Sequence, residues 1–230
     1  MKRLAIIPAR SGSKGLKDKN IIDVCGKPLI SYTIEAALKS NMFDKVIVST
    51  DSAKYGEIVQ KYGAEVIYRD ENISNDKATT YMVIEDLLEK INCKYDYFVL
   101  LQPTSPLRTE RHIREAVELF EKQIEKYDFL VSVKEAEHGS ALVKPIKEDG
   151  SLKYFDTDFS NYRRQEYKEY SPNGAIFIGK PEAYIERKHF FGAKSLAYIM
   201  NEVDSIDIDN ELDYDFACLC MKKKMLGDKK

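Results

Sequence analysis

Short apolar runs alternate along this chain with segments whose apolar residues recur at helical spacing. The strand-like runs lie at 4–8, 45–50, 64–68, 95–102 and 129–133. The helix-like segments lie at 29–39, 53–62, 79–91 and 110–125. Strands that are apolar along nearly their whole length are typical of a sheet buried on both faces. The alternation therefore predicts an α/β fold with a mostly parallel, doubly wound sheet and helices on both faces.

The pattern changes between 135 and 172, where the chain is polar, keeps recurring tyrosines and phenylalanines, and has no clear helical period. A strand pattern resumes at 173–178, and a last helix is expected at 211–224, followed by a basic tail. At 230 residues, with 43% apolar and 32% charged residues, the composition is that of an ordinary globular protein. We therefore expect one domain over 1–230 with the segment 135–172 inserted in it.

Composition also excludes several classes of partner. The formal net charge is -2, so no overall basic field would hold a nucleic acid. No apolar run approaches the ~20 residues that cross a membrane, and no signal peptide is recognisable. The four cysteines form no C-x-x-C pair and are expected to be free thiols. Together these features favour a cytoplasmic protein that acts on small molecules.

In a doubly wound sheet the ligand site lies beyond the carboxyl ends of the strands. The first loop at that edge, 9–20, carries small residues and four cations: Arg10, Lys14, Lys17 and Lys19. It matches neither the P-loop pattern nor the dinucleotide fingerprint. Small residues nevertheless let backbone N–H groups approach an anion closely. The loop therefore indicates a local phosphate site, with a tight turn of solvated lysines as the alternative.

A second polar stretch, LLQPTSPLR at 100–108, leaves the end of the strongest apolar strand. Pro103 and Pro106 restrict its backbone. Gln102, Thr104 and Ser105 supply amide and hydroxyl groups at the ligand edge. A rigid loop of this kind favours a shaped polar pocket.

The third stretch, DSIDID at 204–209, contains paired carboxylates. Asp207 and Asp209 alternate along an extended segment, so both point to one face. Two carboxylates on one face repel unless a cation or donors lie between them, and oxygen ligands suit Mg²⁺. Capping of the last helix by Asp209 or Asn210 is the alternative.

Four motifs together resemble the N-acylneuraminate cytidylyltransferases, also called CMP-sialic acid synthetases. They are IPARSGSKG at 7–15 with Lys19 and Asn20, LLQPTSPLR at 100–108, NGAIFIG at 173–179, and DSIDID at 204–209. The resemblance runs over nearly the whole chain in the expected order. It implies a Rossmann-like nucleotidyltransferase sheet, a Mg²⁺ requirement and a homodimer. It also implies that CTP and a nine-carbon 2-keto sugar acid give a CMP-sugar and pyrophosphate.

The resemblance also assigns roles on the nucleotide side. It implies that Arg10 and Lys19 hold the triphosphate and act in catalysis, with backbone groups of Gly12 and Ser13. It places the cytosine and ribose beside Asn20, Arg69 and Thr80. It gives Mg²⁺ to Asp207 and Asp209, with Asp209 also catalytic.

On the sugar side, the resemblance implies contacts to the sugar acid from Gln102, Phe177, Arg163, Arg164, Phe190 and Phe191. One of the two arginines would help to pair the sugar carboxylate, and it would do so from the partner chain. The segment 135–172 matches the position of a dimerisation subdomain that, in the family, reaches into the partner's active site. Phe177 stands where relatives usually have tyrosine, and simple core packing is the alternative role for Phe190 and Phe191.

Three other readings remain at this stage. A CMP-Kdo synthetase also begins with IPAR but continues toward a different pattern than the GLKDKNI found at 15–21. A synthetase for a bacterial diacyl analogue such as CMP-legionaminate shares the nucleotide chemistry. A non-catalytic nucleotide-sugar-binding protein would be expected to lack Arg10, Lys19, Asp207 or Asp209, all of which are present.

Overall fold

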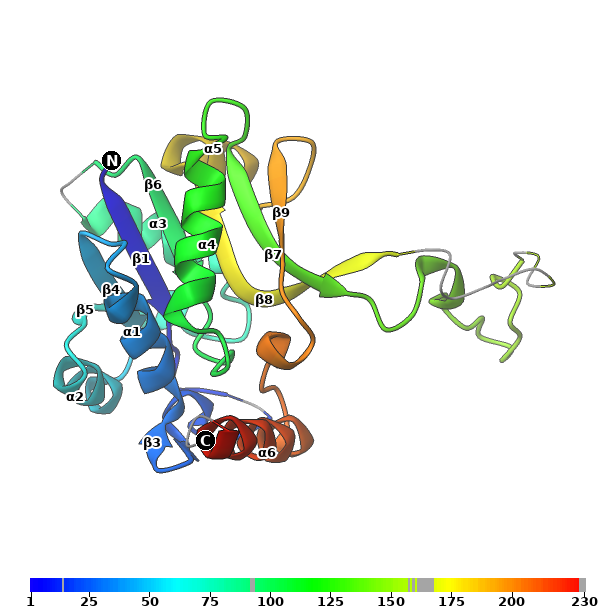
Figure 1. Cartoon of the computed structure of the whole chain (residues 1–230), viewed down its shortest axis with the longest axis horizontal. Helices are drawn as coiled ribbons and strands as arrows, with labels where there is room; N and C mark the ends of the chain where they lie inside the picture. Colours follow the sequence, from blue (N-terminus) through cyan, green and yellow to red (C-terminus); the bar gives the residue numbers. More distant parts are fainter. Residues whose placement is uncertain (14, 92–93, 157, 159, 161–167, 228–230) are drawn as a thin grey trace.

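A seven-stranded sheet forms the centre of the fold, with strand order β5-β4-β1-β6-β8-β7-β9 (Figure 1). The computed structural model describes residues 1–13, 15–91, 94–156, 158, 160 and 168–227. The strands of this sheet are β1 (Arg3–Pro8), β4 (Lys45–Thr50), β5 (Glu65–Tyr68), β6 (Tyr97–Leu101), β7 (Phe129–Glu135), β8 (Tyr170–Gly179) and β9 (Ser195–Ile199).

The sheet is mostly parallel, as the sequence predicts. β1 pairs in parallel with β4 and β6, β4 with β5, and β7 with β9. β8 alone runs antiparallel to both of its neighbours, β6 and β7. The chain moves outward from β1 to β5 and then returns to the other side of β1 as β6. The order reverses there, so the carboxyl ends of β1 and β6 form the expected ligand edge.

Helices cover both faces of the sheet. They are α1 (Leu29–Ser40), α2 (Ala53–Lys61), α3 (Thr80–Lys90), α4 (Glu110–Glu121), α5 (Pro181–Arg187) and α6 (Glu211–Gly227). Residues of α1, α2 and α4 share one buried cluster with Ala5 and Ile7 of β1. Residues of α3 and α5 share the opposite cluster with Leu4 and Ile6. Successive side chains of a strand alternate between faces, so β1 contributes to both cores.

Polar residues fix where three of the predicted helices begin. The Ser52 hydroxyl accepts a hydrogen bond from the Tyr55 N–H at the start of α2, and Thr79 accepts one from Met82 at the start of α3. Thr109 and His112 form a reciprocal capping box at α4. The prediction for the fourth helix was one turn too long, because α4 ends at Glu121 and turns follow it.

A third buried cluster lies beneath α6. It joins α6 to a small hairpin of β2 (Asp23–Val24) and β3 (Lys27–Pro28) and includes Val24, Leu29, Ile208, Ala217 and Met221. Short 3-10 helices complete the fold: η1 (Lys19–Ile21), η2 (Glu71–Ile73), η3 (Ser140–Leu142) and η5 (Val203–Ser205). Among the described residues, no helix combines the length and the apolar character needed to span a membrane.

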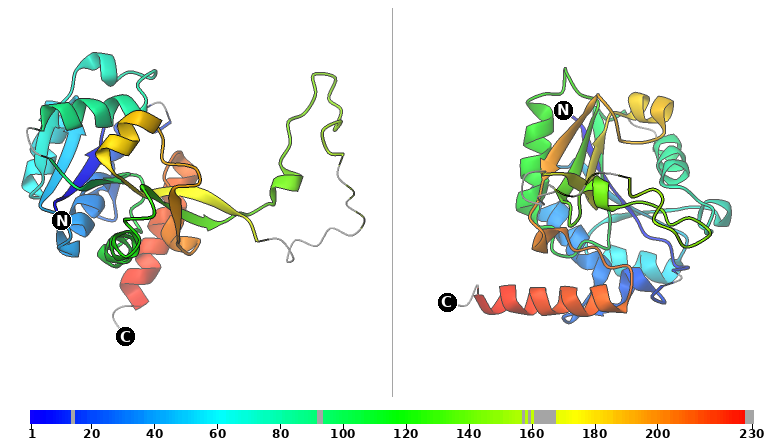
Figure 2. Two further views of the ribbon diagram at one scale, coloured as in Figure 1. Left: turned by 90° about the horizontal axis from the view of Figure 1, so that it is seen from above. Right: turned by 90° about the vertical axis from the view of Figure 1, so that its right-hand side faces the viewer.

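β7 and β8 continue beyond the sheet and carry an arm that projects from the rest of the molecule (Figures 1 and 2). Their ladder is irregular between Val131 and Val133 and then pairs Glu135 with Tyr170. The expected excursion at 135–172 is therefore held by strand pairing at both ends, and its last three residues belong to β8. Apolar side chains are exposed along the arm: Leu142, Val143, Ile146, Leu152 and Tyr154.

Candidate active site

A cleft of about 530 Å³ opens at the carboxyl ends of β1 and β6. Its walls come from the loops after β1, β5 and β6, from the first turn of α3, from Gly174 and Phe177 of β8, and from the segment before α6. Ten of the predicted site residues line it: Arg10, Ser13, Lys19, Asn20, Arg69, Thr80, Gln102, Phe177, Asp207 and Asp209. Loops that are far apart in the sequence thus meet at the edge that the strand pattern predicts.

The loop after β1 is held in place by side-chain hydrogen bonds. The Ser11 N–H and hydroxyl both donate to the Asp51 carboxylate, at 2.9 and 2.7 Å. The Asn20 amide donates to the Arg10 carbonyl oxygen at 2.9 Å. Asn20 is buried, so this hydrogen bond holds the loop from its buried side.

Gly15 is the point at which this loop touches the acidic segment. A Cβ atom at Gly15 would lie 2.6 Å from the Asp209 carbonyl oxygen, whereas one at Gly12 would meet nothing within 4 Å. The close contact at Gly15 is with the acidic segment, so the expected approach of the loop's backbone N–H groups to an anion stays a prediction. Gly12 does not line the cleft, although its neighbour Ser13 does.

Three cationic side chains of the part of the chain that the structure describes line the cleft. Arg10 forms an ion pair with Asp76 at 2.9 Å, and Lys19 forms one with Asp209 at 2.9 Å. Arg69 is 7% exposed, and its Nη1 has no hydrogen-bond partner among the described residues. Burial lowers the pKa of the Arg69 guanidinium below its ordinary value. The negative charge of Asp51 raises this pKa but does not outweigh burial. A buried guanidinium with an unused donor is a site ready for an acceptor. Lys14 lies outside the described residues.

The two predicted metal ligands differ in environment. Burial raises the pKa of the Asp207 carboxyl above its ordinary value, although a hydrogen bond from Thr104 acts in the opposite direction. The Asp207 Oδ1 has no hydrogen-bond partner among the described residues. Asp209 is more exposed and pairs with Lys19. Asn210, not Asp209, caps α6, because its side-chain oxygen accepts from the N–H groups of Leu212 and Asp213.

Several side chains that hold the site were missed by the sequence analysis. Arg108 is 1% exposed, and its Nη1 donates to the carbonyl oxygens of Gln102 and Ala175 at 3.0 and 3.1 Å. It thereby ties the loop after β6 to β8. Burial lowers the pKa of Arg108 to about 9. Arg108 is the last residue of the LLQPTSPLR motif, so the sequence analysis included it. Its neighbours in the sequence do not indicate that this arginine is buried.

A buried network behind Asp207 was also missed. Asn173 accepts from the Ser132 hydroxyl at 2.6 Å and donates to the Ser205 hydroxyl at 2.8 Å. The Ile208 N–H then donates to the Thr104 carbonyl at 2.9 Å. These bonds connect the irregular part of the β7–β8 ladder to the acidic segment, so they fix where Asp207 lies.

A second cavity of about 470 Å³ adjoins the cleft and shares Thr79, Thr80, Gln102 and Phe177 with it. Phe190 and Phe191 both line it, but they differ in burial, at 5% and 47% exposed. Phe190 packs against Phe177 and Tyr184, with ring centroids 5.0 and 4.6 Å apart. It therefore belongs to the core as well as to the cavity wall. Arg163 and Arg164 lie outside the described residues.

Residues 4–217 match the family described as Cytidylyltransferase. The chain belongs to this family. This cytidylyltransferase is 49% identical over 223 residues to the N-acylneuraminate cytidylyltransferase of Escherichia coli O18:K1:H7. That alignment covers 97% of this chain and 53% of the other protein. The chain is 36% identical to the pseudaminic acid cytidylyltransferase of Campylobacter jejuni serotype O:2, covering 96% of this chain and 97% of that protein.

The chain spans about half the length of the N-acylneuraminate cytidylyltransferases it matches. Among solved structures, it is similar to CMP:2-keto-3-deoxy-manno-octonic acid synthetase complexed with CTP, with a TM-score of 0.74 and 17% identity. That alignment covers 97% of this chain and 100% of the other. At this identity the likeness confirms the cytidylyltransferase fold.

Proposed function

We propose that the chain transfers CMP from CTP to the anomeric hydroxyl of a nine-carbon 2-keto sugar acid and releases pyrophosphate. The acceptor is N-acetylneuraminate or a close analogue. The observation that carries this proposal is the cleft that Arg10, Lys19 and Arg69 line together with Asp207 and Asp209. The family match and the 49% identical relative named for this reaction support it.

The nucleotide would bind along the loop after β1. Arg10 and Lys19 supply positive charge for the triphosphate. Backbone N–H groups near Gly12 and Ser13 would supply further donors, with the Ser13 N–H leaving its present acceptor, the Ser11 carbonyl oxygen at 3.0 Å. The unused Nη1 of Arg69 supplies a donor for the ribose or base, beside Asn20 and Thr80. Both ion-paired cations already have acidic partners, so phosphate binding would replace or share the contacts to Asp76 and Asp209.

Asp207 and Asp209 suit a Mg²⁺ ion. The unpartnered, buried Asp207 Oδ1 is an available oxygen ligand at the floor of the cleft. The described residues contain no group of three or more His, Cys, Asp or Glu that could hold a metal by themselves. Phosphate oxygens and water would complete the shell, as is usual for Mg²⁺. When bound, the ion would neutralise phosphate charge.

The reaction itself is an in-line displacement. The hydroxyl oxygen forms a bond to the α-phosphorus, the bond to the bridging oxygen of pyrophosphate breaks, and the hydroxyl proton passes to water. Such transfers depend on alignment and charge neutralisation more than on covalent help. Arg10 and Lys19 would stabilise the charge that develops on the phosphates.

The adjoining cavity would hold the sugar acid. Gln102 and Phe177 line both the cleft and the cavity, and Phe190 and Phe191 line the cavity alone. An apolar wall suits an acyl substituent. We propose that Arg163 or Arg164 pairs with the sugar carboxylate from a second subunit. The exposed apolar residues of the arm support a homodimer, because large exposed apolar surfaces mark interaction sites.

A cytoplasmic location fits the free cysteines Cys25, Cys218 and Cys220, since reduced thiols persist there. We propose no nucleic-acid or membrane partner. The formal charge of -2 offers no general attraction for polyanions.

The test is pyrophosphate release from CTP with a panel of sugar acids. We expect release with N-acetylneuraminate or a diacyl analogue such as legionaminate, and none with Kdo. CTP should be preferred over ATP and GTP by at least about a hundredfold, because polar groups matched to cytosine are left unpaired by another base. Comparable rates with ATP, or release with Kdo alone, would contradict the proposal.

A further inference from the structure

Helix α6 carries two apolar faces. One face, with Ala217 and Met221 buried, packs on the cluster beneath the helix. The other face is exposed, with Leu212 at 78%, Phe216 at 51%, Leu219 at 50% and Leu226 at 68%. A helix that is apolar on opposite faces is normally covered on both.

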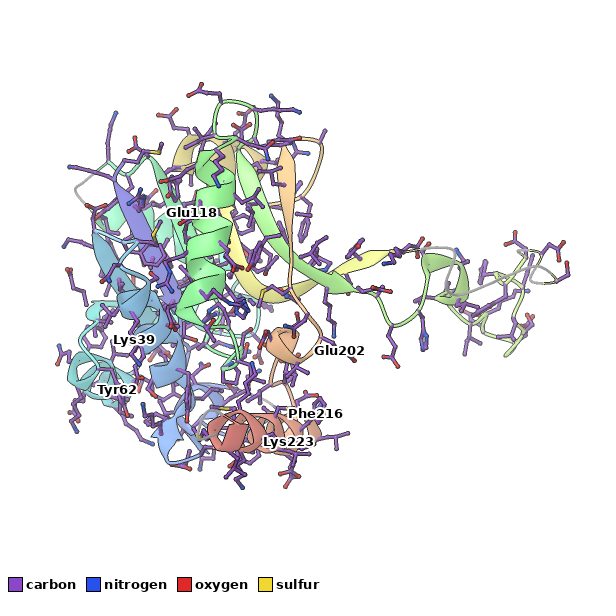
Figure 3. The ribbon with its side chains drawn as sticks, viewed as in Figure 1. Lys39, Tyr62, Glu118, Glu202, Phe216 and Lys223 are labelled. Carbon is purple, nitrogen blue, oxygen red and sulfur yellow. The ribbon has the colours of Figure 1, made fainter. Side chains whose placement is uncertain are left out.

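The exposed residues form a regular stripe. Their spacing, together with Lys223, is four, three, four and three residues along 212, 216, 219, 223 and 226. This is the spacing of the contact seam of a pair of helices. We call these five residues the α6 stripe. Figure 2 shows α6 lying along one edge of the molecule with its last turns extending past the other elements, and Figure 3 labels Phe216 and Lys223 on it.

Charge is divided along the same helix. Its amino half carries Glu211, Asp213 and Asp215, and its carboxyl half carries Lys222, Lys223 and Lys224. Two of these six are already engaged, since Asp213 accepts from the Asn210 N–H and Lys224 pairs with Asp204. Asp215 and Lys222 lie on one flank of the stripe and remain on the outer side of the helix.

We propose that the α6 stripe docks on the α6 stripe of a second copy, with the two helices antiparallel. A two-fold axis at Leu219 brings each Leu212 opposite the other copy's Leu226. The same axis places each Asp215 beside the other copy's Lys222, so opposite charges meet twice. A parallel pair would instead lay the two acidic halves side by side and the two basic halves side by side. Charge complementarity thus selects a second copy in the antiparallel orientation.

The contact is small. A helix of 17 residues is about 26 Å long, so the paired surface is below that of a standard stable interface. We therefore expect weak association by α6 alone. The arm projects from a different part of the molecule (Figure 1), so arm and α6 contacts can coexist, and the proposal does not depend on the enzymatic activity.

The test is thiol cross-linking of the full chain. Leu219→Cys places a thiol at the two-fold axis, and a short bismaleimide would add one thiol to each of its two double bonds. We expect at least about fivefold more covalent dimer than for Met225→Cys, which lies off the stripe on the same helix and is 46% exposed. Wild-type protein sets the background from the natural cysteines. Equal yields for the two variants would overturn the proposal. If the arm of another copy covered the stripe instead, the yields would also be equal, because the arm has no cysteine to react with the second maleimide.

A charge exchange tests the orientation. In the Leu219→Cys background, Asp215→Lys or Lys222→Asp alone places like charges opposite each other, and we expect each to lower the dimer yield about threefold. The double variant should restore it to within about twofold. A double variant no better than either single one would overturn the antiparallel arrangement. Circular dichroism melts verify that each variant is folded.

Discussion

Gly15 joins the two halves of the active site at the scale of a single residue. The loop after β1 brings cations, the segment before α6 brings carboxylates, and the backbone of Gly15 lies against the Asp209 carbonyl. A side chain here would separate the groups that we propose to hold the triphosphate and Mg²⁺. Gly12, three residues earlier in the same loop, has no such constraint.

We predict that Gly15→Ala lowers kcat/KM for CTP by about a hundredfold, because a displacement near 1 Å in a catalytic constellation has an effect of that size. Gly12→Ala is the matched control and should remain near wild-type activity. Steady-state pyrophosphate release measures both, and thermal melts report whether either variant is destabilised. Equal losses in the two variants would contradict the role assigned to Gly15.

Asp209 allows a second test at this scale. Asp209→Asn keeps the side chain's shape but removes a charge from the proposed Mg²⁺ site. We expect turnover to fall by at least about a thousandfold, corresponding to several kcal/mol of lost transition-state stabilisation. Glu57→Gln, on the exposed side of α2, should have no effect. Activity close to wild type at ordinary Mg²⁺ concentrations would contradict the metal assignment.

Among the elements, α4 is fastened to the sheet by a polar cluster at the opposite end from the active site. The Arg3 guanidinium on β1 donates to both oxygens of Glu121, at 2.7 and 3.2 Å, and the Tyr97 hydroxyl on β6 donates at 2.6 Å. Burial alone raises the pKa of Glu121, but the hydrogen bonds from Arg3 and Tyr97 outweigh it and lower the pKa below its ordinary value.

The sign of the pH dependence follows. A carboxyl with a lowered folded-state pKa stabilises the fold above its unfolded pKa, near 4.3, and this stabilisation is lost as the pH falls through the folded value. Glu121→Gln should lower Tm at pH 7 by roughly 3 °C, for about 1 kcal/mol. The difference from wild type should persist at pH 5 and shrink below about pH 4. Glu118→Gln, exposed on the same helix, should leave Tm unchanged. A difference that grows on acidification would contradict this account.

The elements also differ in how well the sequence predicts them. β1, β4, β6 and α1 were predicted closely, because their apolar periodicity is set by local burial on one or both faces. The antiparallel direction of β8 could not be predicted, since strand direction depends on where the arm returns. The chain's pattern gave no signal for α5 and β9, whose residues at 181–187 and 195–199 are largely half-buried or exposed.

The site divides in the same way. Residues that would touch the ligand carry recognisable chemistry in motifs, and ten of them meet in one cleft. Residues that position them, such as Arg108 and Asn173, act through burial and hydrogen bonds to distant segments. Those contacts exist only once the strands have paired, so no local pattern could reveal them.

At the scale of the whole molecule, the arm projects from the single subunit with exposed apolar side chains. Complementation tests whether it completes a partner's site. Asp209→Asn and Arg164→Ala proteins, each expected to be inactive, are mixed under conditions that exchange subunits. If the arginine acts across the dimer, half of the dimers are mixed and each holds one intact site, so activity should return to about a quarter of wild type. The same mixture is made with Arg163→Ala.

The control for this experiment is proof of exchange, obtained with two differently tagged wild-type pools. If exchange occurs, both arginine variants are inactive alone, and neither mixture recovers activity, the shared site is wrong.

The pairing of β7 with β8 at the base of the arm has a consequence for how such a protein can change over evolutionary time. The Ala136 N–H donates to the Glu169 carbonyl at 2.8 Å, so the segment between them begins and ends at adjacent positions of one hairpin. A hairpin closes with a loop of almost any length. Insertions, deletions or exchanges of this segment would leave the sheet register, the loop after β1 and the carboxylate pair where they are. Any acceptor contact that the arm contributes can therefore change without altering the nucleotide chemistry, whereas the contacts proposed for Gln102, Phe177, Phe190 and Phe191 lie outside the arm.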